Sequence, residues 1–192
     1  MLAFSLPSLL VCIFGVVLFN AQGSEQFAVG VSQESDVAQG AERASCEGSM
    51  GSNKCVKIKS VCYCFVKTQL SWELANNFCK ANSMSLLSIE TQSEQQAVSE
   101  TLMPIVLGEP ISKKIGVWTS GSYNPGQKTF TWSATQKAFT FVNWFYGEPN
   151  TGGTNQCVRI RIVPESLISG KWATLNCDQW LPFICQDQSG KP

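Results

Sequence analysis

The sequence predicts an α+β domain that is held together by disulfide bonds. Residues 71–81 place Trp72, Ala75 and Cys79 on one face at the spacing of an α-helix. Residues 158–163 alternate apolar and basic side chains, as a half-buried β-strand does. The chain also has nine cysteines among its 192 residues, which is typical of a protein from an oxidising compartment.

Two helices are predicted, each with a defined beginning. Ser71 stands at the N-cap position of the first helix. Residues 91–94, Thr-Gln-Ser-Glu, form a capping-box pattern that opens a second helix, with Val98 and Leu102 facing inward. Pro104 should end this second helix one residue earlier, because proline disfavours the helical conformation in the residue before it.

Strands are predicted at 158–163 and at five other stretches: 60–66, 86–89, 116–119, 129–132 and 180–185. The segment between Ser120 and Gln156 carries few regular patterns and is interpreted as a long loop region, which in a compact domain is usually functional or disordered. The tryptophans are all expected in the core: Trp72, Trp118, Trp132, Trp144, Trp172 and Trp180.

The first 23 residues are interpreted as a signal peptide. An unbroken apolar run, residues 9–19, precedes small residues, Ala21 and Gly23, at the positions of a cleavage site. The run is short for a membrane span and has no flanking basic residue; the alternative interpretation is an uncleaved signal anchor. Cleavage would remove Cys12 and leave eight cysteines, an even number that fits a secreted chain without membrane insertion.

Residues 24–54 are expected to form a flexible acidic leader that precedes a domain at residues 55–192. The leader is rich in Ser, Gly, Ala, Gln and Glu, and Phe27 is its only aromatic residue, so it cannot bury enough apolar surface to offset its ordering entropy. Over the whole chain, 14 basic residues balance 14 acidic ones, which argues against nucleic acid or anionic lipid as a partner. The absence of histidine excludes Ser-His-Asp and Cys-His catalysis.

A set of short motifs occurs in a fixed order between Tyr63 and Gln186. In chain order they are W-x-x-A-x-x-x-C from Trp72, residues 117–121 (VWTSG), 130–132 (FTW), 141–144 (FVNW), 148–150 (EPN), Cys157, Trp172, Cys177 and 182–185 (PFIC). This set resembles the C-type lectin-like domain, in its secreted, invertebrate-type long form. The resemblance implies a fold with two helices flanking small antiparallel sheets, a long loop region and a role in recognition.

The resemblance also implies two disulfide bonds, Cys79–Cys185 and Cys157–Cys177. Four cysteines remain near the additional N-terminal hairpin of the family's long form: Cys46, Cys55, Cys62 and Cys64. Cys62 and Cys64 would point to the same side of a strand, which disfavours a bond between them. Cys46 and Cys55 are then expected to be their partners, in either order, unless Cys46 links two chains.

In sugar-binding members of the family, a Glu-Pro-Asn motif with a cis proline binds both calcium and mannose-type sugars. By resemblance, Glu148 and Asn150 match the motif's ligands and Pro149 its cis proline. The carboxylate accepts hydrogen bonds and the amide can donate them, which suits sugar hydroxyls that do both. Asn155 completes the sugar-binding set. The aromatic rings of Phe145 and Tyr146 could stack on a sugar face without any metal, unless at least one of them is a core residue.

The calcium ligands that the resemblance implies are incomplete. Asn155 stands where the family has a glutamate, and Ala173 and Thr174 stand where it has an asparagine and an aspartate. The remaining ligands are Glu148, Asn150, Asn155 and the hydroxyl of Thr174. Because calcium affinity rises with ligand charge, we expect binding at about millimolar strength or weaker.

The sequence therefore predicts a secreted recognition protein that binds carbohydrate or a glycosylated surface, with a weak calcium site. The alternative is a calcium-independent member of the same fold that binds protein or ice, because the fold alone does not determine the ligand. An enzyme is not expected, because the chain has no histidine and no G-x-S-x-G motif. A role in innate recognition is implied by the family resemblance alone.

Overall fold

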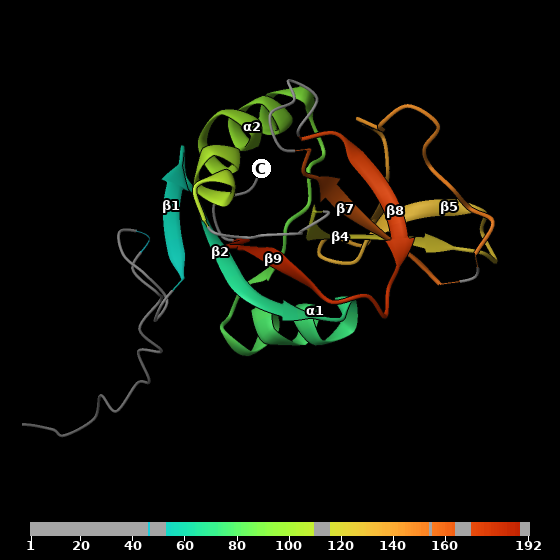
Figure 1. Cartoon of the computed structure of the whole chain (residues 1–192), viewed down its shortest axis with the longest axis horizontal. Helices are drawn as coiled ribbons and strands as arrows, with labels where there is room; N and C mark the ends of the chain where they lie inside the picture. The colour runs from blue at the N-terminus through green and yellow to red at the C-terminus, as the bar shows by residue number, and fades with distance from the viewer. Residues whose placement is uncertain (1–45, 47–52, 110–115, 154, 164–169, 189–192) are drawn as a thin grey trace, which may run out of the picture. The chain divides into compact units, whose positions relative to one another are not determined.

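The computed structural model describes residues 46, 53–109, 116–153, 155–163 and 170–188. Within these residues the chain forms two helices and nine strands, and the strands belong to one connected sheet (Figure 1). The predicted α+β fold class is confirmed. The expected signal peptide and nearly all of the expected leader lie outside the described residues.

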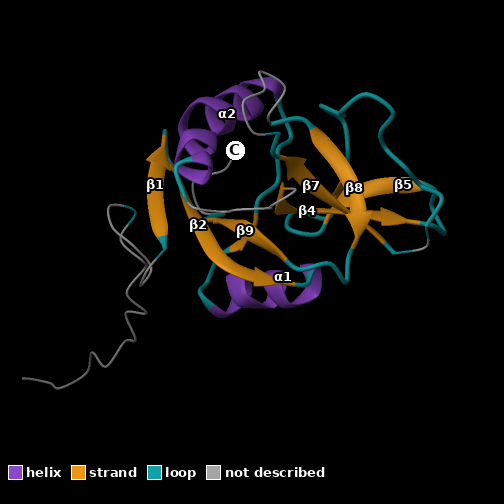
Figure 2. Ribbon diagram, in the orientation of Figure 1, coloured by secondary structure: helices purple, strands orange, loops and turns teal. Residues whose placement is uncertain are grey.

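One half of the sheet pairs the beginning of the domain with its end. β1 (Lys54–Ile58) and β2 (Val61–Leu70) form an antiparallel hairpin, and β2 pairs with the last strand, β9 (Leu181–Gln186). β9 also pairs with β3 (Ser85–Leu86) and makes a parallel bridge with β4 (Gly116–Asn124). Figure 2 shows β2 and β9 between the two helices.

The other half of the sheet carries the long loop. β4 pairs with β5 (Thr129–Trp132), and β5 pairs with β6 (Lys137–Ala138). On its other side β4 pairs with β7 (Gln156–Arg161), and β7 pairs with β8 (Trp172–Asn176). The connection from β6 to β7 contains the Glu-Pro-Asn motif, so this half of the sheet positions the candidate site.

Helix α1 (Trp72–Ala81) packs against β3 and β9. As its spacing predicts, Ala75 and Cys79 are fully buried. Ser71 occupies the N-cap position, although its side chain makes no capping hydrogen bond. Neither this helix nor the other described helix is long and apolar enough to cross a membrane.

Helix α2 (Gln92–Leu107) packs against β1 and β2 and begins at the predicted capping box. The Thr91 hydroxyl accepts a hydrogen bond from the Glu94 backbone, and the Glu94 carboxylate accepts one from the Thr91 backbone. Val98 and Leu102 are buried, as predicted. This reciprocal cap satisfies two donors that a helix N-terminus otherwise leaves unpaired.

Two predictions from sequence patterns are wrong. Helix α2 does not end before Pro104 but continues to Leu107, because Met103 and Val106 on either side of the proline are buried against the core. Trp180 is not a core residue: its side chain is 61% exposed in the connection between β8 and β9.

Three strands, β1, β6 and β8, were not predicted. Polar–apolar alternation does not predict β8, because Trp172, Ala173 and Thr174 are buried in succession.

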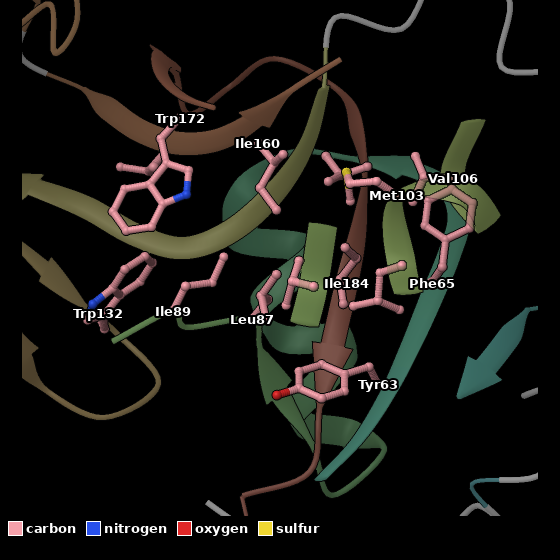
Figure 3. Close-up of a cluster of buried hydrophobic side chains, with 14 of the residues drawn as sticks. Tyr63, Phe65, Leu87, Ile89, Met103, Val106, Trp132, Ile160, Trp172 and Ile184 are labelled. Atoms are coloured by element: carbon pink, nitrogen blue, oxygen red, sulfur yellow. The ribbon is translucent and has the colours of Figure 1, made fainter. Parts of the chain in front are cut away.

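Two buried indole rings lie at one side of the hydrophobic core (Figure 3). Trp132 and Trp172 are fully buried and meet edge to face, with ring centroids 5.3 Å apart. The indole N–H of Trp172 donates to Gln95 Oε1 at 2.7 Å, and Gln95 Nε2 donates to the Gly170 carbonyl at 3.2 Å. Leaving such a buried N–H unpaired would cost about 1–3 kcal/mol, so Gln95 fixes β8 to α2.

Four disulfide bonds join the cysteines of the described residues, and two of them are the pairings that the resemblance implies. The Cys62 and Cys64 side chains do not bond to each other. Cys46 is bonded within the chain, so the hypothesis that it links two chains is wrong. The pairs are Cys46–Cys62, Cys55–Cys64, Cys79–Cys185 and Cys157–Cys177.

The segment after α2 is tied to the N-terminal hairpin by one carboxylate. Glu109 forms ion pairs with Lys54 and Lys67, each at 2.8 Å. Hydrogen bonds from Lys54 and then Lys67 lower the pKa of the Glu109 carboxyl below its ordinary value of 4.5. This group therefore stabilises the fold fully above its unfolded pKa, and the contribution is lost as the pH falls through the lower, folded pKa.

We predict that Glu109→Gln lowers the Tm at neutral pH and flattens the decline of Tm on acidification below pH 4.5, because the substituted amide does not titrate. The measurement is thermal unfolding across the acid range. Glu100→Gln, which removes an exposed carboxylate on α2, is the matched control and should retain the native slope. Identical slopes for native and Glu109→Gln chains would contradict the prediction.

Candidate functional site

The Glu-Pro-Asn motif lies in the connection between β6 and β7, alongside β8. Phe145 N–H donates to the Trp172 carbonyl at 2.8 Å, and Trp172 N–H donates to the Asn143 carbonyl at 2.8 Å. Glu148 N–H then donates to the Phe145 carbonyl at 3.0 Å, which closes a turn before the motif. The peptide bond between Glu148 and Pro149 is cis. Backbone hydrogen bonds thus place the motif next to β8.

One carboxylate oxygen organises the motif. Glu148 Oε2 accepts a hydrogen bond from the Thr174 hydroxyl at 2.6 Å, from Thr174 N–H at 3.0 Å and from Asn150 N–H at 3.0 Å. Asn150 N–H also lies 3.0 Å from Thr174 Oγ1. Hydrogen bonds to a charged acceptor are about twice as strong as neutral ones. The Glu148 carboxylate is therefore held against β8 by donors from the protein itself.

The outer groups of the motif remain available. Asn150 Oδ1 accepts a hydrogen bond from Gly152 N–H at 3.0 Å. Within the described part of the chain, neither Oε1 of Glu148 nor Nδ2 of Asn150 has a hydrogen-bond partner. The motif consequently offers one free acceptor, Glu148 Oε1, and one free donor, Asn150 Nδ2, on residues two positions apart in the sequence.

Two aromatic residues before the motif have different surroundings. Tyr146 is 96% exposed, as a residue that stacks on a ligand requires. Phe145 is half-buried, and the guanidinium carbon of Arg161 lies 4.0 Å from its ring centroid. This cation–π contact fixes Phe145 as part of the scaffold.

The structure does not join Asn155 to the network around Glu148. Asn155 Nδ2 donates instead to Asp178 Oδ2 at 3.3 Å, and its carbonyl accepts a hydrogen bond from Cys177 N–H at 3.1 Å. Sequence reasoning missed Asp178. The Cys157–Cys177 disulfide, which the resemblance implies, could have indicated this contact, because it brings residues 155 and 178 close together.

Sequence reasoning also missed a basic group near Glu148. Burial, and then the charge of Arg161, lower the pKa of the Arg159 guanidinium, whereas the Glu148 carboxylate raises it. Arg159 therefore lies within electrostatic range of Glu148. The alternation along β7 could have predicted this group. Val158 and Ile160 face the core, so Arg159 and Arg161 share the opposite face of the strand.

These groups do not fit a calcium ion. Calcium requires about six to eight oxygen ligands and binds more tightly as their negative charge rises. Ala173 offers no side-chain oxygen, Glu148 Oε2 already accepts three hydrogen bonds, and Arg159 adds positive charge. The residues that the structure describes contain no cluster of three or more His, Cys, Asp or Glu side chains suited to a metal.

Residues 68–187 match the family model described as the Lectin C-type domain. The chain belongs to the C-type lectin family. It is 24% identical over 125 residues to salivary C-type lectin 1 of Aedes albopictus, a match that covers 65% of this chain and 80% of the relative. Proteins of this family are carbohydrate-binding or recognition proteins rather than enzymes, in agreement with the resemblance.

Solved structures share the C-type lectin fold. A complex of SPL-1 with GlcNAc superposes with a TM-score of 0.59 at 19% identity, over 77% of this C-type lectin and 98% of the other chain. The Ca²⁺-independent C-type lectin SPL-2 from Saxidomus purpuratus superposes with a TM-score of 0.58 at 22% identity, over 70% of this chain and 92% of the other. At these identities the likeness concerns the fold.

We predict that Thr174→Val destabilises the domain by about 1.5–3 kcal/mol, because it removes a hydroxyl that donates to the Glu148 carboxylate. Thr174→Ser keeps the donor and should retain most of the native stability. Urea unfolding measures both variants, with the m-value as a check on two-state behaviour. A Thr174→Val chain as stable as the native chain would show that this hydrogen bond contributes nothing.

Proposed function

We propose that this C-type lectin is a secreted recognition protein that binds carbohydrate, including the glycans of a glycosylated surface, through the loop around Glu148 and Asn150 and without requiring calcium. One observation carries the proposal. Oε2 of Glu148 is held by three protein donors, while Oε1 of Glu148 and Nδ2 of Asn150 have no partner among the described residues.

The free groups match the chemistry of adjacent sugar hydroxyls. Each hydroxyl both donates and accepts, so one can donate to Glu148 Oε1 while its neighbour accepts from Asn150 Nδ2. The Glu-Pro-Asn order favours mannose-type over galactose-type sugars, on the resemblance to sugar-binding members of the family. The exposed ring of Tyr146, two residues before Glu148, offers an apolar face for a sugar ring.

The donors of Thr174 support a calcium-independent mode of binding. Here the hydroxyl and N–H of Thr174 orient the Glu148 carboxylate, a role that a cation fills where calcium is bound. The fold neighbour SPL-2 is described as a Ca²⁺-independent C-type lectin, and SPL-1 is described in complex with GlcNAc. Any affinity for calcium should be about millimolar or weaker, given one carboxylate in the network.

Secretion is part of the proposal. All eight cysteines of the described residues form disulfide bonds, which persist in oxidising compartments. The relative from Aedes albopictus is named as salivary. We propose cleavage after residue 23, with residues 24–54 as a leader and residues 55–192 as the lectin domain.

We predict that the purified chain is retained on mannose-agarose equally in calcium and in EDTA, because Glu148 is oriented by Thr174. Glu148→Gln and Asn150→Ala should each weaken retention by about tenfold, the loss of one hydrogen bond of about 1.5 kcal/mol. Glu100→Gln is a matched carboxylate control on the exposed side of α2 and should bind like the native chain.

Each other outcome contradicts part of the proposal. Retention that disappears in EDTA would show that calcium is required. Retention that persists in Glu148→Gln and Asn150→Ala would place the sugar elsewhere on the domain. Absence of retention in both buffers, on mannose and on other neutral sugars, would favour the alternative of a protein-binding or ice-binding member.

A further inference from the structure

Three cationic side chains share one face of the β7–β8 pair. Because side chains alternate along a strand, Arg159 and Arg161 of β7 lie on the same face, opposite the core-facing Ile160. Arg161 N–H donates to the carbonyl of Lys171 at 2.7 Å, which places the exposed Lys171 directly across from Arg161. Lys171 precedes the buried Trp172 and therefore belongs to the face that carries the two arginines.

No carboxylate of the described residues forms an ion pair with Arg161 or Lys171. Lys171 Nζ donates to Asn143 Oδ1 at 2.6 Å, and this amide oxygen is a neutral acceptor. Like charges directly opposite each other in a sheet are destabilising. Cations grouped in this way, in a chain whose acidic and basic residues balance, indicate an anion that comes from outside the chain.

The Arg161 guanidinium is held in position while its hydrogen-bond donors remain unused. Its central carbon lies 4.0 Å from the centroid of the Phe145 ring, and Phe145 N–H is bonded to the Trp172 carbonyl at 2.8 Å. Among the described residues, no acceptor takes a hydrogen bond from the guanidinium N–H groups. These N–H groups form a planar fork that can donate two parallel bonds to one oxyanion. A side chain whose position is already restricted loses less entropy when it binds.

These cations adjoin the candidate sugar site. Phe145, against which Arg161 packs, stands three residues before Glu148. Burial and then the charge of Arg161 lower the pKa of the Arg159 guanidinium, and the Glu148 carboxylate raises it, so the three groups lie within electrostatic range of one another. Together with Lys171 they carry a net charge of +2, which favours an anionic group beside the sugar that Glu148 binds.

We propose that Arg161 and Lys171 form an anion subsite, which binds the carboxylate or sulfate ester of an acidic sugar residue next to the one that Glu148 and Asn150 hold. Arg159 adds its positive charge to the same face. The inference rests on the proposed function and specifies its ligand: a mannose-type glycan that carries an acidic group. Opposite charge there contributes to selectivity among glycans as well as to affinity.

The test is a calorimetric titration with three probes: α-mannobiose, and the same disaccharide carrying either a carboxylate or a sulfate ester on one residue. We expect the native chain to bind at least one acidic probe about tenfold more tightly than the neutral one, as one charge-assisted hydrogen bond provides. The difference should shrink between about 0.1 M and about 1 M salt, because the Debye length falls from about 10 Å to about 3 Å. The acidic probe that gains affinity identifies the oxyanion.

Variants separate this subsite from the sugar site. Arg161→Gln and Lys171→Gln should each abolish most of the preference for the acidic probe while the neutral probe still binds. Lys171→Gln, which changes an exposed side chain, remains informative if Arg161→Gln lowers the Tm. Lys57→Gln removes an exposed lysine from β1, at the other end of the sheet, and is the matched control that should keep the preference.

The outcomes distinguish the two proposals. Equal affinity of the native chain for all three probes, or a preference that both Arg161→Gln and Lys171→Gln retain, would overturn the anion subsite and leave the proposed function intact. Binding of an acidic probe that depends on Arg161 and Lys171 but is unaffected by Glu148→Gln and Asn150→Ala would instead contradict the proposed function. Failure of every probe to bind would overturn both.

Discussion

The candidate site depends on the hydrogen bonds that Glu148 accepts from Thr174 and Asn150. They join the connection between β6 and β7 to β8, so the motif has a fixed conformation only as long as β8 is fixed. β8 is fixed in turn by the bond from Trp172 to Gln95 of α2, inside the core. β8 thus links a hydrogen bond in the core, from Trp172 to Gln95, to the hydrogen bonds that Thr174 donates to Glu148 in the surface loop.

Hydrogen-bond donors of Thr174 and Asn150 surround the Glu148 carboxylate, whereas a bound cation would neutralise the carboxylates of a calcium site. A calcium site needs several carboxylates that repel one another until the ion binds. By the family resemblance, Ala173 and Thr174 occupy two ligand positions, and the Arg159 guanidinium on β7 lies within electrostatic range of Glu148. The fold is that of a C-type lectin, and the calcium-independent binding proposed above agrees with the rule that a fold does not determine its ligand.

Much of the fold could be predicted because its signals are local. The capping box at Thr91 and the helical spacing from Trp72 to Cys79 each depend on residues within a few positions. Local sequence patterns gave the wrong end for helix α2 at Pro104 and did not predict strand β8. Both elements are determined by burial of their side chains against distant parts of the fold. At the site, the motif residues Glu148 and Asn150 could be read from sequence.

The partners of those site residues could not be read from sequence. The bonds from Thr174 to Glu148 and from Asn155 to Asp178 join residues more than twenty positions apart, and only the folded sheet brings them together. The measurement that tests the account most directly is a calorimetric titration of calcium into the native chain and a Thr174→Asp chain. We predict no saturable binding at micromolar calcium for the native chain, and a gain in affinity for Thr174→Asp, which adds a second carboxylate beside Glu148. Micromolar binding to the native chain would contradict the claim that Thr174 takes the place of the ion.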